Sequence, residues 1–416
     1  MKSTRPFRRD PLPRSQHGLT LVELLVAVVI GLVVTLAVTS TITIGEAHKR
    51  TTTSNNDIGQ AGAYSASVLD RALRSAGSAF TQAWSAGGVF GCKLSADRSN
   101  AAILPRTDAD GAFKAPFAGF LGDLAGQKDL RVAPVLIGKS QSKSGSDVLM
   151  VMGSNGAAGD VARPSIGNAG GDQLTLNTTI GLLKNDLVLV SQSGKTDCRL
   201  DQVSSASTFD DNYTDRISHE FGRGSLPLAG SYHNASNTTA LLSVADGSGY
   251  LSALGKPDNI QFLLFGVGDN HTLFSYDLLR TGGTDTPQPI AEGVYGLYAR
   301  YGLDTNLDGK LDTWAAPDAT GWDIATVMKT PATARQIVAV RVALVMRSTL
   351  YEKSSSTNVK VDGEADASYV APSKLTLFTS LDATFQQDVP ITDRHYRHRV
   401  VEFTVPLRNM LLLPTT

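Results

Sequence analysis

The sequence predicts an α+β protein, in which a long N-terminal helix packs on a large domain of antiparallel β-sheet. Three observations support this fold class. An almost uncharged apolar run occupies residues 19–45, and a helical repeat of apolar positions continues over residues 46–80. From residue 81 to residue 416, short apolar runs alternate with clusters of Gly, Ser and Asn, as in strands joined by turns.

The composition is that of a folded chain with an uneven distribution of charge. Of the 416 residues, 42% are hydrophobic and 19% are charged, which is enough apolar material for a core. Residues 1–18 contain five basic residues and one acid, a net charge of +4, which leaves −5 for the remainder of a chain with a total of −1. This mildly acidic remainder shows no basic surface of the kind that binds nucleic acid.

The apolar run from Leu19 to Ile44 has 26 residues, and Glu23 is its only charged residue. A helix of that length is about 39 Å long, which is enough to cross a bilayer. The basic residues before it keep the N-terminus in the cytoplasm and place the bulk of the chain outside. A secretory signal peptide would have a shorter apolar core followed by a small-residue cleavage site, which "TSTITIGEAHKR" does not offer. A plain signal anchor is the simpler alternative.

The segment "GLTLVELLVAVVIGL" resembles the processing site of type IV pilins and pseudopilins. The resemblance implies that residues 1–18 are a leader, that a prepilin peptidase cuts after Gly18, and that Leu19 becomes a methylated N-terminus. Leu19 departs from the Phe that is most usual there. Glu23 is the fifth residue after the cut, where this family keeps its Glu.

Glu23 requires an explanation, because an unpaired carboxylate in hydrocarbon costs several kcal/mol. The cut after Gly18 would create a positive amine four residues before Glu23. The resemblance implies that Glu23 pairs with such an amine, its own or that of a neighbouring subunit, during assembly. The alternative is a side chain that reaches the lipid headgroups from near the end of the helix.

The two cysteines, Cys92 and Cys198, predict one disulfide, because the N-terminus indicates export to an oxidising compartment. The alternative is a pair of unrelated buried thiols.

Residues 46–77 continue the helix with one apolar face that should pack against a sheet. The run "TTTSNN" is a poor helix former and is expected to interrupt it locally, and Gly77 is the expected stop. The positions of the apolar face are Ile58, Ala61, Ser65, Val68, Leu69, Ala72, Leu73 and Ala76.

The predicted strands are 147–152, 185–192, 259–265, 338–348 and 399–409. In "VAVRVALVMRS" the apolar positions alternate with Arg341 and Arg347, which predicts a half-buried strand of an antiparallel sheet. Residues 204–257 are polar and are expected to form a large surface loop.

The segment "YGLDTNLDGKLDTW" suggests a calcium loop. Oxygen donors at alternate positions, a Gly and a further acid suit a hard cation, although Ala315 stands where a bidentate Glu is usual. The alternative is a plain turn, since Asp, Asn and Gly are ordinary turn residues. The candidate calcium ligands are Asp304, Asn306, Asp308, Lys310 through its carbonyl, and Asp312.

Further segments resemble the PilW family of minor pilins: "LDRALRSAG", "GVFGC", "EGVYGLYARYGLDTNLDGKLDTW", "VAVRVALVMRS" and "HYRHRVVEFTVPLRN". The resemblance implies a pilin-like fold and a structural role, first in the bacterial inner membrane and then at the pilus tip. The implied partners are the prepilin peptidase, other minor pilins, the major pilin, a large tip adhesin and inner-membrane lipid. The alternatives are a minor pseudopilin of a type II secretion system, or a membrane-tethered periplasmic enzyme or calcium-dependent adhesin. The sequence shows no catalytic constellation, and we expect no enzyme activity.

Overall fold

The computed structural model describes residues 18, 20–85, 88–105, 113–121, 129–154, 162–170, 173–179, 181–204, 224–233, 249–280, 286–352, 369–411 and 413. The chain divides into two compact units, Met1–Asn55 and Asn56–Thr416. Leu19 and residues 1–17 of the predicted leader lie outside the described residues.

The N-terminal unit contains the first part of α1 (Leu21–Arg74), a helix of 54 residues. The expected interruption at "TTTSNN" was wrong, because α1 is continuous from residue 51 to residue 56. The hydroxyl of Thr52 donates to the carbonyl oxygen of His48 one turn earlier, at 3.0 Å. Low intrinsic propensity is a weak signal, and a long helix on both sides of the run overrides it.

The second part of α1 belongs to the larger unit and packs its apolar face there, as predicted. The face positions are buried or half-buried, and Leu69 and Leu73 have no exposed surface. Gly62 also lies on this face, where an added Cβ would come within 3.1 Å of Val401, so a glycine permits a close approach of helix and strand. The helix ends at Arg74, and Gly77, with a φ of +78°, lies in the turn that follows.

The predicted antiparallel β-sheet domain is present, and its described strands form three larger sheets and one two-stranded pair. The first is eight-stranded, in the order β2-β1-β8-β7-β10-β5-β6-β9. Its strands are β1 (Lys93–Arg98), β2 (Ala101–Leu104), β5 (Arg163–Gly170), β6 (Gln173–Leu176), β7 (Leu187–Gln192), β8 (Asp197–Gln202), β9 (Gly224–Pro227) and β10 (Gly249–Gly255).

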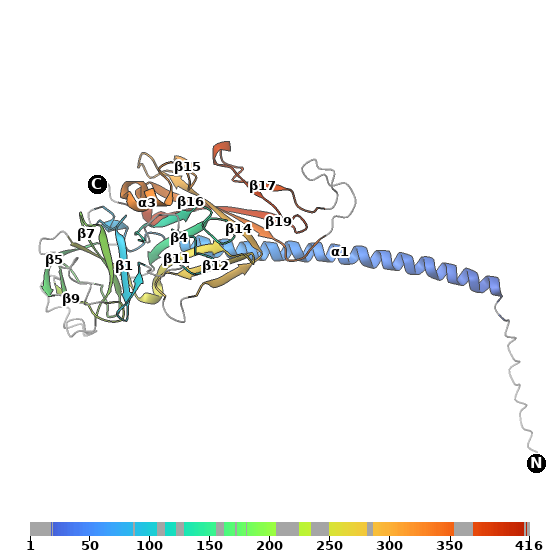
Figure 1. Ribbon diagram of the computed structural model, residues 1–416, viewed down its shortest axis with the longest axis horizontal. Coiled ribbons are helices and arrows are strands. Elements are labelled where there is room, and N and C mark those ends of the chain that lie inside the picture. The colour runs from blue at the N-terminus through green and yellow to red at the C-terminus, as the bar shows by residue number, and fades with distance from the viewer. Residues whose placement is uncertain are drawn as a thin grey trace, which may run out of the picture. The chain divides into compact units, whose positions relative to one another are not determined.

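The second sheet has five strands in the order β13-β12-β11-β4-β3, and the third has four in the order β15-β14-β16-β19. Figure 1 shows β4, β11 and β12 side by side, and β16 between β14 and β19. The strands of the second are β3 (Val135–Gly138), β4 (Val148–Ser154), β11 (Ile260–Val267), β12 (Thr272–Asp277) and β13 (Gln288–Glu292). Those of the third are β14 (Val294–Leu303), β15 (Thr313–Ala315), β16 (Ile337–Arg347) and β19 (His398–Pro406).

Short elements complete the unit. The pair β17 (Lys374–Leu377) and β18 (Gln387–Pro390) forms a two-stranded sheet. The described short helices are η1 (Thr81–Ala83), η5 (Pro257–Asn259), α3 (Ile324–Lys329), α4 (Pro331–Arg335), η7 (Ala383–Phe385) and α5 (Arg408–Leu411).

The expectation that residues 204–257 form a surface loop was wrong for β9 and β10. Strand β10 is almost wholly buried and pairs with β7 and with β5. The strand was not predicted, because its Gly and Ser residues are typical of turns. Residues 205–223 and 234–248 of this stretch lie outside the described residues. The pairs are antiparallel throughout the described ladders except for β1 with β8, which is parallel.

Strand β16 is buried on both faces, so the predicted half-buried alternation was also wrong. Val340, Val342 and Leu344 join the main core, whereas Ala343 and Val345 join a second cluster. The second cluster is covered by side chains from the chain around β17 and β18, including Phe378 and Val389. Hydrophobic periodicity in the sequence can predict that one face of a strand is buried. It cannot show whether a segment distant in the sequence also buries the opposite face.

Candidate functional site

The N-terminus of α1 is capped by a threonine. The backbone N–H of Glu23 donates to the hydroxyl oxygen of Thr20 at 3.3 Å, and the N–H of Leu24 donates to the carbonyl oxygen of Thr20 at 3.1 Å. Gly18 is exposed just outside the helix, and Leu19 lies outside the described residues. The predicted cleavage position therefore directly precedes a helix cap. The T-x-x-E spacing of Thr20 and Glu23 is a capping signature that our sequence analysis missed.

The helix that follows is long and apolar enough to cross a membrane, with a mean hydropathy of 2.9 over its most apolar window. Its large apolar side chains between Leu21 and Ile44 are at least half exposed, which in water would be an extensive apolar surface. Glu23 lies in the first turn, where the helix dipole favours a negative charge. The chain thus presents one carboxylate at the start of an otherwise apolar surface.

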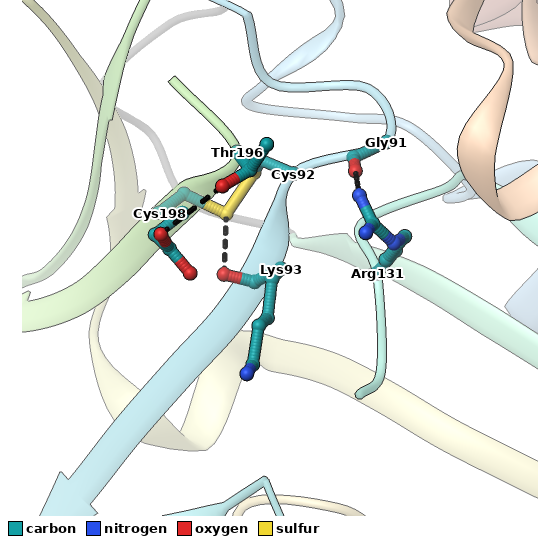
Figure 2. Close-up of a disulfide and its surroundings, with 7 residues drawn as sticks. Gly91, Cys92, Lys93, Arg131, Thr196 and Cys198 are labelled. Carbon is teal, nitrogen blue, oxygen red and sulfur yellow. Dashed lines mark hydrogen bonds between the residues drawn. A yellow bond between two sulfur atoms is a disulfide. The ribbon is translucent and has the colours of Figure 1, made fainter. Parts of the chain in front are cut away.

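The predicted disulfide is present. Cys92 and Cys198 are bonded across a Cα–Cα distance of 5.6 Å, and both are buried (Figure 2). Cys92 lies just before β1, and Cys198 lies in β8. The bond therefore joins two segments that are 106 residues apart in the sequence.

Hydrogen bonds near the disulfide hold the same two segments together and attach Arg131 to the first of them. Lys93 N–H donates to the carbonyl oxygen of Thr196 at 2.6 Å, where β1 begins its parallel pairing with β8. The guanidinium of Arg131 donates to the carbonyl oxygen of Gly91 at 2.6 Å. The disulfide has a structural role, because it is buried and fixes the first strand of the larger unit to a strand far along the chain.

The candidate calcium loop connects β14 to β15 as a series of turns. The buried carboxylate of Asp304 accepts the N–H groups of Asp308 and Gly309, at 3.1 and 2.7 Å. The carboxylate of Asp312 accepts the N–H and hydroxyl of Thr305, both at 2.8 Å, and the hydroxyl bond is the largest factor that lowers the pKa of Asp312.

The remaining candidate ligands of the loop also bond within it. The side-chain oxygen of Asn306 accepts from Asp308 N–H at 2.9 Å, and the carboxylate of Asp308 accepts from Lys310 N–H at 2.9 Å. Within the described part of the chain, no three His, Cys, Asp or Glu side chains form a group suited to a metal ion. This geometry is that of a turn stabilised by its own side chains, and calcium binding stays a prediction.

Two family models match the chain. Residues 13–39 match the prokaryotic N-terminal methylation motif, and residues 265–409 match type IV pilus-assembly protein W. Together these two matches make the chain similar to PilW-family type IV pilins. No curated protein and no solved structure matches it.

The PilW match covers about a third of the chain and contains the whole four-stranded sheet. The candidate calcium loop and the segments "VAVRVALVMRS" and "HYRHRVVEFTVPLRN" lie inside the matched range. The disulfide and the eight-stranded sheet lie outside both matches, as do "LDRALRSAG" and "GVFGC". The two family-model matches therefore lie toward the two ends of the chain.

Proposed function

We propose that this PilW-family protein is a minor pilin of a type IV pilus that joins the complex that primes assembly and occupies the pilus tip. The observation that carries the proposal is the combination, in one chain, of a methylation motif at residues 13–39 and a PilW region at residues 265–409. The apolar part of α1 supports storage in the inner membrane, with the larger unit in the periplasm. The matched families are structural, and no enzyme activity is proposed.

Processing would convert the N-terminus into an assembly element. A prepilin peptidase would cut after Gly18, and the new amine at Leu19 would then stand four residues before Glu23 in the sequence. Inside a filament, neighbouring apolar helices would replace lipid, and each carboxylate would still require a positive partner. Pairing of Glu23 with the amine of an adjacent subunit satisfies both groups and selects a processed neighbour.

The larger unit would determine the neighbours. Its partners in this proposal are other minor pilins, the major pilin and a large tip adhesin. The bulk of the Asn56–Thr416 unit favours the tip, because a domain of this size packs poorly along a regular shaft.

Mass spectrometry of the N-terminal peptide from sheared surface filaments tests the proposal. A methylated peptide that begins at Leu19 is the expected result. A chain that keeps Met1 and is absent from filaments would refute it and favour a signal-anchored protein. A processed chain that is absent from filaments would favour a pseudopilin of a type II secretion system.

A variant tests the role of Glu23. Glu23→Ala should leave the protein in the membrane, because the apolar run is unchanged, and should reduce its incorporation into filaments. Glu46→Ala is the matched control, since Glu46 is an exposed acid just beyond the apolar run. Normal incorporation of the Glu23 variant would exclude the pairing role.

A further inference from the structure

Strand β19 is a long and regular edge strand. It lies at one end of the four-stranded sheet and pairs with β16 over nine residues, from His398 to Pro406, without a register shift. The other edges of the described larger sheets, formed by β2, β3, β9, β13 and β15, have three to five residues. An edge of this length is a template for another strand unless something protects it.

The hydrogen bonds that flank β19 show which of its backbone groups face away from β16. Leu407 N–H donates to the carbonyl oxygen of Val338, and Ser348 N–H donates to that of Arg397, both at 2.8 Å. Pairs joined by hydrogen bonds alternate with pairs that are not, so the odd-numbered residues of β19 bond to β16.

The even-numbered residues of β19 therefore direct their backbone groups outward. These residues are His398, Val400, Glu402, Thr404 and Pro406. Within the described residues, none of their backbone N–H or C=O groups takes part in a backbone hydrogen bond on the outer side. From His398 to Thr404 the open edge is roughly 20 Å long.

The usual protections of an edge are weak here. There is no bulge, and Pro406, which offers no outward N–H, limits only one end. Glu402 does not guard the edge, because its carboxylate bonds to Arg341 at 3.0 Å and to the N–H of Phe378 at 2.6 Å. The negative charge of Glu402 is therefore neutralised by Arg341 and does not repel a strand that approaches the edge.

We propose that the outer edge of β19 receives an extended strand from a different protein of the pilus assembly. The inference deepens the proposed function and rests on it for the source of the strand. Backbone hydrogen bonds to Val400, Glu402 and Thr404 hold the added strand, as in other cases of strand addition. The side chains of the added strand alternate between the two faces of the sheet. On each face they meet a half-buried valine of β19, because Val401 packs against the main core and Val400 packs against the second cluster.

Charge complementarity favours a partner over a second copy of this chain. Arg399 is exposed next to the outward groups and makes no ion pair in the part of the chain that the structure describes. A second copy of β19 would bring only Glu402 as an acid, and that carboxylate is already bonded to Arg341. The strand that fits carries an acidic residue opposite Arg399 and apolar residues at alternate positions.

Hydrogen exchange of the purified full-length chain in detergent tests whether the edge is open. The amides of Val400, Glu402 and Thr404 should exchange about a hundredfold faster than those of Val401 and Phe403, which bond to β16. Protection of the outward amides in the isolated protein would overturn the proposal, because the edge would already be covered.

Photo-cross-linking in cells tests which protein supplies the strand that pairs with β19. Benzoylphenylalanine replaces the exposed Pro406 as the probe, in a Thr404→Pro chain and in a matched Thr404→Ala chain. Proline at position 404 removes an outward N–H that β16 does not use, so the sheet keeps its own bonds. Thr404→Pro should lower the yield of a cross-link to another protein about tenfold or more, and Thr404→Ala should not.

Equal yields in the two chains, or a cross-link only to a second copy of this chain, would overturn the proposal. If Thr404→Pro does not fold, fast exchange at positions 400, 402 and 404 together with a cross-link to another protein in the Thr404→Ala chain still tests the proposal. The filament test of the N-terminal peptide separates the two ideas. A chain absent from filaments whose cross-link in the membrane is sensitive to Thr404→Pro would reject filament incorporation and retain strand addition.

Discussion

Replacing His398 with glutamine should make the folded protein more resistant to acid. His398 begins β19, and its Nδ1–H donates to the carbonyl oxygen of Tyr396 at 2.9 Å. Its Nε2 is buried and has no hydrogen-bond partner among the described residues. The ring packs against Tyr295 in a T-shaped arrangement, at a centroid distance of 5.1 Å. Burial of this neutral ring lowers the pKa of His398 from 6.5 to about 4, and the nearby Arg347 cation contributes.

The direction of the effect follows from which state binds the proton first. Between pH 6.5 and about pH 4 the unfolded chain holds a proton on His398 and the folded chain does not, so stability falls as the pH falls. Each unit of difference between the pKa of His398 in the unfolded and the folded state corresponds to about 1.4 kcal/mol. The free energy of unfolding therefore falls by about 3 kcal/mol across this pH range. The pKa of His271 is also lowered, mainly by burial, so part of the acid sensitivity remains in the variant.

Urea unfolding of the full-length protein in detergent, at pH 7 and pH 4, measures the effect. Glutamine can donate to the carbonyl oxygen of Tyr396 but cannot take up a proton. We expect the free energy of unfolding to fall by about 3 kcal/mol less in His398→Gln than in the wild type. His48→Gln, at an exposed position of α1, controls for the loss of a histidine. If wild type and His398→Gln lose the same stability, the buried-histidine argument is wrong.

Three further predictions concern stability. Gly153→Ala should cost at least about 2 kcal/mol in urea unfolding, because its Cβ would lie 2.1 Å from the carbonyl oxygen of Ser75; a neutral result would refute this packing. Non-reducing peptide mapping should find Cys92 linked to Cys198, and reduction should cost about 4 kcal/mol; two free thiols would contradict the structure. Calcium should raise the melting temperature of the full-length chain, and Asp308→Ala should abolish the rise; no response to calcium leaves only the turn.

Local signals carried much of the fold and of the N-terminal site. The apolar run from Leu21 to Ile44 and the repeat from Ile58 to Leu73 are both parts of α1, because helical periodicity depends only on near neighbours. The disulfide was predictable because the chain has only two cysteines and its N-terminus indicates export.

The larger unit contained the features that the sequence did not reveal. Strand β10 was hidden by its Gly and Ser residues, and only its pairing with β7 identifies it. The sequence also did not predict the open edge of β19. A strand is an edge strand when it pairs on only one side, and the sequence of the strand does not show how many neighbours it has.

The sequence by itself determined the helix, the apolar span and the predicted processing site, because each depends on residue type and short spacing. It also determined the disulfide, because the chain has only two cysteines. Only the tertiary structure decided the burial of β16 on both faces, the buried environment of His398 and the exposed edge of β19. Each of these depends on segments distant in the sequence, such as the chain around Phe378 that covers β16. Long-range packing determines which faces meet, and a local pattern does not encode which partner covers a face.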